Sequence, residues 1–281
     1  MERAVQTPFV TTDWLAAHLE DDNLVIVDAS WHMPNVSRDA QAEFREGHIP
    51  GAVFFDIDAI SEKFTDLPHM LPTPQAFAQA VGALGISETS TIVVYDETGL
   101  FSAPRVWWTF KIFGAQNVLM LEGGGPKWRS EQRPTETGEH QALPAVFNPQ
   151  FKPEAVADFD TVLARLSDKK AQVLDARPAP RFNAEVPEPR AGLRSGHMPG
   201  AINVPVGTLT EAGILRSDDE LKTLFAERGV DLDRPIITSC GSGITAAVLT
   251  LALQRAGAQS VAIYDGSWTE WGSRADAPIE P

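Results

Sequence analysis

The chain has a single cysteine, Cys240, at a point where a strand is expected to lead into a helix. The apolar, β-branched segment 235–239 predicts a buried strand, and residues 245–256 predict a helix. The amides of the loop between them and the dipole of the helix favour an anion at the helix N-terminus. We therefore expect a thiol that ionises readily and acts as a nucleophile. The alternative is a buried structural cysteine.

The charge and composition of the chain exclude some kinds of binding partner. Its 281 residues include 23 basic and 38 acidic side chains, a formal charge of −15, so we expect no nucleic-acid partner and no membrane partner. A lone cysteine forms no internal disulfide and fits a reducing compartment. The first residues lack an apolar signal region, and no stretch is long enough to cross a bilayer. These features predict a cytoplasmic protein, and the spacing of its six histidines predicts no metal site.

Four landmarks occur twice in the same order, with offsets of 143 to 149 residues. They pair residues 24–29 with 172–176, 47–52 with 196–201, 91–96 with 235–240, and 122–123 and Trp128 with 265–266 and Trp271. A repeated order with nearly constant spacing indicates a duplicated domain. We predict an N-terminal domain over residues 1–135, a linker over 136–157 and a C-terminal catalytic domain over 158–281.

Each copy alternates short apolar strands with helical stretches, which predicts an α/β fold with a parallel sheet flanked by helices on both faces. Ligands of such sheets bind beyond the carboxyl ends of the strands, where Cys240 lies. The predicted strands are 24–28, 52–55, 91–95, 118–121, 172–175, 202–204, 235–239 and 261–264. The predicted helices include 12–20, 74–84, 104–113, 153–167, 217–228 and 245–256.

The two copies differ at the position of the thiol. Asp96 stands where the second copy has Cys240, so the first copy is expected not to carry the reaction. The motif around His48 recurs around His197, as Gly-His-Ile-Pro-Gly-Ala and Gly-His-Met-Pro-Gly-Ala. Because both copies keep this motif and only one keeps the thiol, we expect both histidines to serve the fold.

Taken together, the duplicated unit, the paired Gly-His turns and the lone cysteine of the second copy resemble the two-domain rhodanese superfamily. The loop Cys240-Gly241-Ser242-Gly243-Ile244-Thr245 is similar to that of its 3-mercaptopyruvate sulfurtransferases. Rhodaneses proper usually carry basic residues directly after the cysteine. The resemblance runs from about Trp14 to Asp276.

This resemblance implies two tandem rhodanese-like domains, with the active site in the second. It implies that the Cys240 thiolate takes the sulfur of 3-mercaptopyruvate as a persulfide and releases pyruvate. A thiol, cyanide or a protein with a reduced thiol would then accept the sulfur. No metal or organic cofactor is implied, because the persulfide itself carries the group.

The resemblance also assigns roles to single residues. Arg181 and Arg190 would bind the substrate carboxylate, a task that suits the planar guanidinium group. Without the resemblance, both would be interpreted as surface arginines paired with Glu185 or Glu188. The persulfide would lie among the backbone amides of the loop, in a substrate-binding set that comprises Gly241, Gly243, Ile244 and Thr245.

A proton relay is implied as well, running from Ser242 through His69 to Asp58. Such a relay suits the reaction, because the thiol must lose a proton and an enolate leaving group must gain one. Asp58 has another interpretation from the sequence alone, as the residue that caps a helix starting at Ala59.

Three other functions remain open at this stage. A thiosulfate:cyanide sulfurtransferase would use the same thiol, and relative kcat/KM for the two donors distinguishes it. A cysteine phosphatase needs an arginine six residues after the cysteine, where this chain has Ala246. A non-catalytic sulfur carrier would accept sulfur once and release no pyruvate in repeated turnovers.

Overall fold

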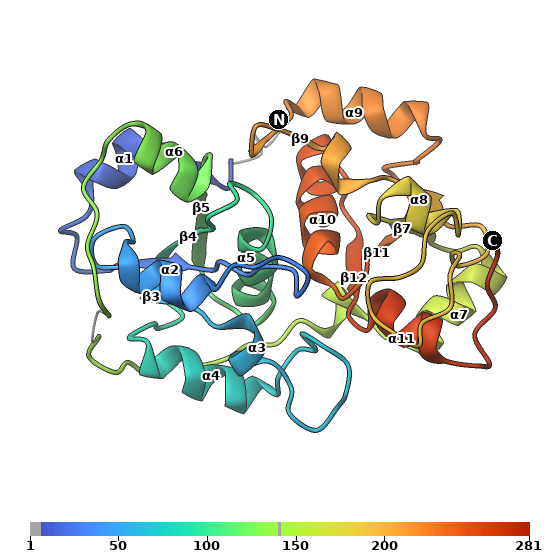
Figure 1. The fold of residues 1–281 in the computed structure, drawn as a ribbon, viewed down its shortest axis with the longest axis horizontal. Coiled ribbons are helices and arrows are strands. Elements are labelled where there is room, and N and C mark those ends of the chain that lie inside the picture. Colours follow the sequence, from blue (N-terminus) through green and yellow to red (C-terminus); the bar gives the residue numbers. More distant parts are fainter. Residues whose placement is uncertain (1–6, 140–141) are drawn as a thin grey trace. The chain divides into compact units, whose positions relative to one another are not determined.

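The computed structural model describes residues 7–139 and 142–281 of the chain. They form two compact units (Figure 1). The N-terminal unit holds the residues up to Glu62, Pro72–Lys152 and Ala212–Ile214, and the C-terminal unit holds Lys63–Leu71, Pro153–Glu211 and Leu215–Pro281. The segment Lys63–Leu71 therefore packs with the C-terminal unit, although its sequence lies in the first copy. No helix in the described ranges is long and apolar enough to cross a bilayer.

The N-terminal unit contains a five-stranded sheet with the strand order β1-β5-β4-β2-β3. All its strand pairs are parallel, so the carboxyl ends of the strands share one edge. In chain order its elements are β1 (Phe9–Val10), α1 (Thr12–Ala17), β2 (Leu24–Asp28), α2 (Ala40–Glu46), β3 (Val53–Phe54), α3 (Ile57–Ile60), α4 (Pro74–Ala83), β4 (Thr91–Tyr95), α5 (Ala103–Ile112), β5 (Asn117–Leu121) and α6 (Gly124–Ser130).

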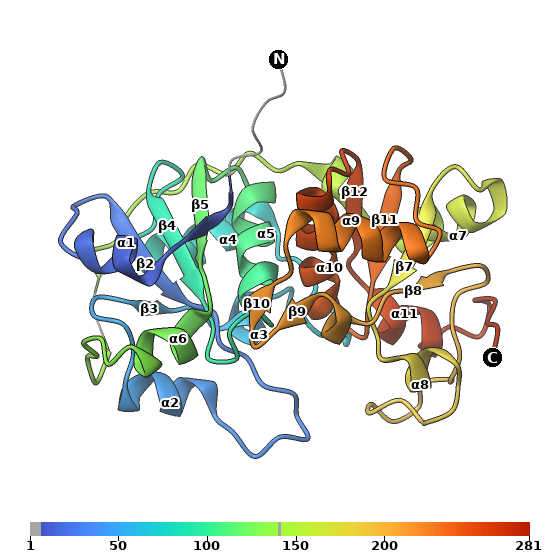
Figure 2. The same cartoon turned by 90° about the horizontal axis from the view of Figure 1, so that it is seen from above.

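The sheet of the C-terminal unit repeats this arrangement, with the order β6-β12-β11-β7-β8 and parallel pairs throughout (Figure 2). Its central strand β11 corresponds to β4. The second half of the chain comprises η1 (Pro153–Ala155), β6 (Val156–Ala157), α7 (Phe159–Asp168), β7 (Gln172–Asp175), α8 (Ala179–Phe182), β8 (Ile202–Asn203), η2 (Val206–Thr208), β9 (Thr210–Glu211), β10 (Ile214–Leu215), α9 (Asp218–Glu227), β11 (Ile236–Ser239), α10 (Ile244–Ala256), β12 (Val261–Tyr264) and α11 (Ser267–Ser273).

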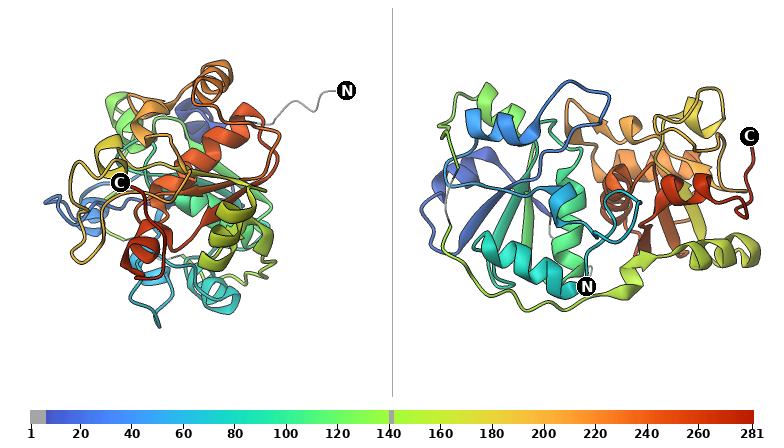
Figure 3. Two further views of the ribbon diagram at one scale, coloured as in Figure 1. Left: turned by 90° about the vertical axis from the view of Figure 1, so that its right-hand side faces the viewer. Right: turned by 60° about the horizontal axis from the view of Figure 1, so that its bottom comes forward.

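Helices cover both faces of each sheet, and the views in Figure 3 show these layers from two further directions. In the N-terminal unit, Leu15 of α1, Phe44 of α2 and Trp128 of α6 pack on one face, and α5 packs along β4 and β5. In the C-terminal unit, α7 and α11 pack on one face through a core that includes Trp271, and α10 lies along β11 and β12. The predicted fold, two parallel sheets each flanked by helices on both faces, is confirmed.

One predicted helix is wrong at its start. Residues 153–167 were expected to be a single helix, but Pro153–Ala155 form a 3₁₀ turn and Val156–Ala157 join the sheet as β6. The helix begins only after Asp158, whose side chain accepts a hydrogen bond from the amide of Thr161. An aspartate in this N-cap position satisfies an amide at the helix start that has no partner within the helix.

The two Gly-His turns have the structural role expected of them. The Nδ1 of His48 donates to the carbonyl of Phe44 at 2.7 Å, and its ring stacks on that phenylalanine at 3.9 Å. In the second copy His197 makes the same two contacts with Phe182, at 3.0 and 3.9 Å. Each histidine thus packs beneath a turn that leads into the edge strand of its sheet.

Candidate active site around Cys240

Cys240 lies directly after β11, at the carboxyl edge of the sheet in the C-terminal unit, and its side chain is 2% exposed. Gly243 has a φ of 82° and forms the N-cap of α10. Because residues with a Cβ rarely adopt this left-handed conformation, a glycine allows the chain to turn from strand to helix within three residues. The helix therefore starts four residues after the thiol and directs its N-terminal amides towards the loop.

The first copy has a carboxylate at the position equivalent to Cys240. The carboxylate of Asp96, at the position equivalent to Cys240, is fully buried and accepts five backbone hydrogen bonds of 2.7 to 2.9 Å. The donors are the amides of Thr98, Gly99, Phe101, Ser102 and Ala103. Such a set of amides offsets the desolvation of one negative charge. The first copy thus contains a filled anion site.

In the second copy the loop is three residues shorter, because α10 starts four residues after Cys240, whereas α5 starts seven residues after Asp96. Within the described residues, the amides of Ser242 and Gly243 donate to no backbone carbonyl. A thiolate or persulfide at Cys240 would carry its charge where the first copy holds a carboxylate. The local geometry therefore suits stabilisation of a sulfur anion.

The N-terminal end of α11 binds two carbonyls of residues 240–243, the loop between β11 and α10 that is called the catalytic loop below. The carbonyl of Cys240 accepts from the amide of Trp268 at 2.9 Å, and the carbonyl of Gly241 accepts from the amide and the hydroxyl of Thr269 at 2.9 and 2.7 Å. In a trans peptide the N–H points away from the C=O. Binding these two carbonyls outwards therefore directs the amides of Gly241 and Ser242 the other way. At the position of Thr269 the first copy has Pro126, which has no N–H to donate.

His69 and Ser242, which the family resemblance assigns to one proton relay, lie close together within the C-terminal unit. The Nδ1 of His69 lies 3.0 Å from the hydroxyl oxygen of Ser242 and 3.3 Å from its carbonyl oxygen. Both side chains are buried, at 3% and 6% exposure. An imidazole at hydrogen-bond distance from a hydroxyl is suited to exchange a proton with it.

Asp58 belongs to the N-terminal unit and lies in the first turn of α3. Its Oδ2 accepts a hydrogen bond of 3.0 Å from the indole of Trp31. Both residues line a pocket of about 340 Å³ beyond the carboxyl ends of β2 and β3. The capping interpretation of Asp58 is wrong, because Asp56 is the N-cap and accepts from the amide of Ala59.

Arg181 lies in α8, beside the catalytic loop. A Cβ placed on Gly241 would come within 3.2 Å of its Nη2. Arg181 also donates from Nε and Nη2 to Glu188, whose side chain is only 2% exposed. The pairing with Glu188 considered from the sequence is thus present, but it is buried and not a surface contact. Glu188 binds the edge of the guanidinium group formed by Nε and Nη2, and no hydrogen bond from Nη1 is present among the described residues.

Glu188 is one member of a chain of alternating charges. It accepts a hydrogen bond of 2.8 Å from Arg177, which in turn binds both oxygens of Asp175 at the end of β7. Arg177 and Asp175 are each 1% exposed. Glu188, Arg177 and Asp175 therefore link Arg181 to the end of β7. Arg190 is half-buried in the loop that leads from α8 to β8.

Sequence reasoning missed three contributors to this site. Glu188 was considered only as a surface partner of the arginines, and neither Thr269 nor Asp265 was singled out. Their contacts join residues that are far apart in the chain: Thr269 to Gly241, and Asp265 to the amide of Leu71 at 2.8 Å. One signal in the sequence could have found Asp265: the repeated Asp265-Gly266 pair follows the predicted strand 261–264, just as Cys240 follows the predicted strand 235–239. The carboxyl ends of parallel strands share one edge of a sheet, so both turns were expected at that edge.

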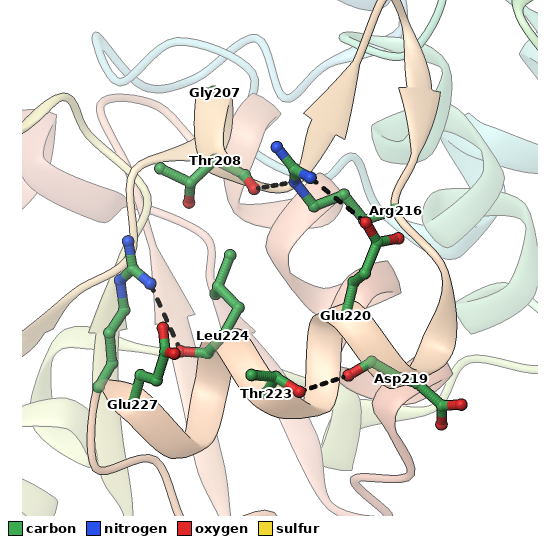
Figure 4. Close-up of a pocket in the computed structure, with 9 residues that line it drawn as sticks. Gly207, Thr208, Arg216, Asp219, Glu220, Thr223, Leu224 and Glu227 are labelled. Carbon is green, nitrogen blue, oxygen red and sulfur yellow. Dashed lines mark hydrogen bonds and ion pairs between the residues drawn. The ribbon is translucent and has the colours of Figure 1, made fainter.

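A larger pocket lies elsewhere in the C-terminal unit, between η2 and α9, with a cavity volume of about 620 Å³ (Figure 4). Arg216 in this pocket donates to the carbonyl of Thr208 at 2.9 Å and lies 3.5 Å from Glu220. The residues that line it include none of the predicted site residues. Across residues 7–139 and 142–281 no group of three or more histidine, cysteine, aspartate or glutamate side chains is arranged to hold a metal ion.

The chain belongs to the rhodanese family: the model for the rhodanese-like domain matches it twice, over residues 11–131 and 158–274. It is 50% identical over 276 residues to the 3-mercaptopyruvate sulfurtransferase of Escherichia coli K12, an alignment that covers 98% of each chain. It is 41% identical to the thiosulfate sulfurtransferase of Gallus gallus, over 97% of this chain and 96% of the relative. The crystal structure of the 3-mercaptopyruvate sulfurtransferase SseA from E. coli superposes with a TM-score of 0.87 at 47% identity, covering 94% of this chain and 99% of SseA.

Proposed function

We propose that this enzyme transfers the sulfur of 3-mercaptopyruvate to a nucleophilic acceptor through a persulfide on Cys240. One observation carries the proposal: Cys240 replaces a buried carboxylate in a loop whose amides bind that carboxylate in the sister copy. The 50% identity to a 3-mercaptopyruvate sulfurtransferase over nearly the whole chain supports the same substrate.

The reaction would proceed in two half-reactions. The Cys240 thiolate attacks the sulfur of the substrate, so that an S–S bond forms and the C–S bond breaks. The electron pair of the C–S bond remains on carbon as an enolate, which takes a proton and leaves as pyruvate. In the second half-reaction a nucleophile attacks the outer sulfur of the persulfide, and the Cys240 thiolate returns. No metal or organic cofactor is required, because the persulfide carries the sulfur.

Ser242 and His69 are proposed to move the protons. Their hydroxyl and imidazole lie 3.0 Å apart, which is a distance suited to proton exchange. Asp58 is proposed as the third member, holding the imidazole in one orientation as carboxylates do in serine hydrolases. The amides of Gly241, Gly243, Ile244 and Thr245 would surround the sulfur anion.

Arg181 and Arg190 are proposed to bind the carboxylate of the substrate. Since the Nε side of Arg181 already binds Glu188, a substrate carboxylate would approach the end formed by Nη1 and Nη2. The buried Glu188 would keep that end aimed at the catalytic loop. A substrate with its charge on a carboxylate, away from the reacting sulfur, suits this arrangement.

A second candidate donor is thiosulfate, which the name of the relative from Gallus gallus raises. Thiosulfate carries two charges next to the reacting sulfur, and residues 241–245 include no basic side chain. We therefore expect a higher kcat/KM for 3-mercaptopyruvate, measured by pyruvate release, than for thiosulfate, measured by thiocyanate formation. A clear preference for thiosulfate would reverse the choice of donor.

The acceptor is proposed to come from outside the chain. Because the chain contains no second cysteine, no internal thiol attacks the persulfide, and a small thiol, cyanide or a protein thiol must do so. We also propose the cytoplasm as the compartment, where such thiols stay reduced. The domain limits 1–135 and 158–281, with a linker over 136–157, are proposed as well; limited proteolysis should cut first within 136–157.

A further inference from the structure

The segment Lys63–Leu71 belongs to the C-terminal unit, although the residues before and after it belong to the N-terminal unit, and it carries His69, the proposed proton-transfer residue. Its residue His69 is 3% exposed and has a backbone φ of 62°. A non-glycine residue in this left-handed conformation is uncommon and persists where the surrounding contacts fix it. The approach of His69 to Ser242 therefore depends on contacts that hold this segment in place.

One such contact is made by Asp265, directly after β12. Its side chain is 4% exposed, and its Oδ2 accepts a hydrogen bond of 2.8 Å from the backbone amide of Leu71. Leu71 is only two residues from His69, so fixing its amide restricts the backbone that carries the imidazole. A hydrogen bond from an amide to a buried carboxylate is among the stronger ones in proteins.

The duplicated copy provides a comparison. The residue equivalent to Asp265 is Glu122, which follows β5 in the same way. Its side chain is 39% exposed and pairs with Lys127 at 3.0 Å. Only the copy that has the thiol therefore has a buried carboxylate, Asp265, at this position.

We propose that Asp265 is a positioning residue that holds His69 at Ser242 by binding the amide of Leu71. The inference rests on the proposed function in one respect only, namely that His69 takes part in proton transfer. The docking of the segment onto Asp265 is independent of which substrate the enzyme uses.

A double-mutant cycle between Asp265→Asn and His69→Ala tests the coupling. His69→Ala should lower kcat by about 100-fold, as removal of a proton-transfer group does. Asp265→Asn alone should lower kcat by about tenfold. This factor corresponds to about 1.4 kcal/mol, which is the contribution expected of one such hydrogen bond. In the His69→Ala background the same change should lower kcat by less than about twofold. KM should stay within about twofold throughout, since neither residue is assigned to the substrate carboxylate.

Glu122→Gln is the matched control and should leave kcat unchanged. Leu71→Pro provides a second route, because it removes the donor amide without touching the core of the C-terminal unit, and it should reproduce the effect of Asp265→Asn on kcat. Equal losses from Asp265→Asn in the wild-type and His69→Ala backgrounds would overturn the inference, since they would reveal a general structural effect.

Hydrogen exchange separates this inference from the proposed function. In the full-length protein without substrate, the amides of residues 63–71 should exchange faster in Asp265→Asn than in the wild type. Unchanged exchange would refute the docking role of Asp265, whatever the enzyme does. Absence of pyruvate release by the wild type, with faster exchange in Asp265→Asn, would refute the proposed function and leave the docking role supported.

Discussion

Replacing Asp28 by asparagine should stabilise the N-terminal unit above neutral pH. Asp28 ends β2, is 1% exposed, and its Oδ1 accepts a hydrogen bond of 2.9 Å from the amide of Ser30. The equivalent Asp175 binds the guanidinium group of Arg177 at 2.7 Å, but Ser30 stands at the position of that arginine. Burial raises the pKa of Asp28 from 3.8 to about 7, against the opposing effect of its hydrogen bonds with Ser30.

The sign of the effect follows from this raised pKa. In the unfolded chain Asp28 ionises near pH 4, whereas in the folded protein it ionises near pH 7. Between these values the folded state binds the extra proton, so the free energy of unfolding falls as the pH rises. The loss is about 1.4 kcal/mol per pH unit, or about 4 kcal/mol once Asp28 is ionised in both states.

Thermal unfolding of the wild type and of Asp28→Asn at several pH values measures this loss. Asparagine keeps the shape and the acceptor for Ser30, but it never ionises. The melting temperature of the variant should exceed that of the wild type at pH 8, and the difference should shrink towards pH 5. Asp175→Asn is the matched comparison and should destabilise at both values, because it removes one of the two carboxylates that pair with the buried Arg177. A variant that is no more stable than the wild type at pH 8 would refute the reasoning.

Three further predictions concern the thiol, the arginine proposed to bind the substrate carboxylate, and the loop after the thiol. Cys240→Ser should abolish pyruvate release and shift the melting temperature little; substantial remaining turnover would contradict the persulfide mechanism. Arg190→Ala should mainly raise KM for 3-mercaptopyruvate and lower kcat less, because orientation is partly lost; an unchanged KM in steady-state assays would remove Arg190 from the substrate site. Thr269→Val should remove one of two hydrogen bonds to Gly241, worth about 1 kcal/mol, and lower kcat for pyruvate release by up to about fivefold. The control Thr109→Val, which loses a buried hydrogen bond in α5, should leave kcat unchanged.

Local sequence signals predicted the centres of both sheets. The strands 24–28, 91–95, 172–175 and 261–264 have the limits that the structure gives them. These runs are apolar and β-branched, and they lie between helices on both sides, so the pattern is continuous and unambiguous.

The edges of the sheets were not predictable in the same way. β1 and β6 are two residues long, and the hairpin of β9 and β10 has strands of the same length. Two residues show no periodicity, and their pairing is decided by where the rest of the sheet places its edge. The helix expected over 153–167 failed for this reason: the sheet recruits Val156–Ala157, which shifts the helix start to Phe159.

The candidate site divides in a similar way. The strand, the glycine loop and the helix around Cys240 are adjacent in sequence, and they were predicted from residue types alone. The meeting of His69 with Ser242 joins residues 173 positions apart, and only the family resemblance suggested it. The contact between Asp265 and Leu71 spans 194 positions and has no local signature. Contacts of this kind depend on how the chain returns to the sheet edge, and no spacing rule in one sequence specifies that return.

The most direct test of the persulfide mechanism is the mass of the peptide that contains Cys240, measured after the folded protein has been exposed to 3-mercaptopyruvate without an acceptor. The mechanism predicts one added sulfur atom on that peptide and one equivalent of pyruvate released. It also predicts that the added mass is lost when cyanide or a thiol is supplied. Repeated pyruvate release with Cys240 left unmodified and unreactive towards alkylating reagents would contradict it.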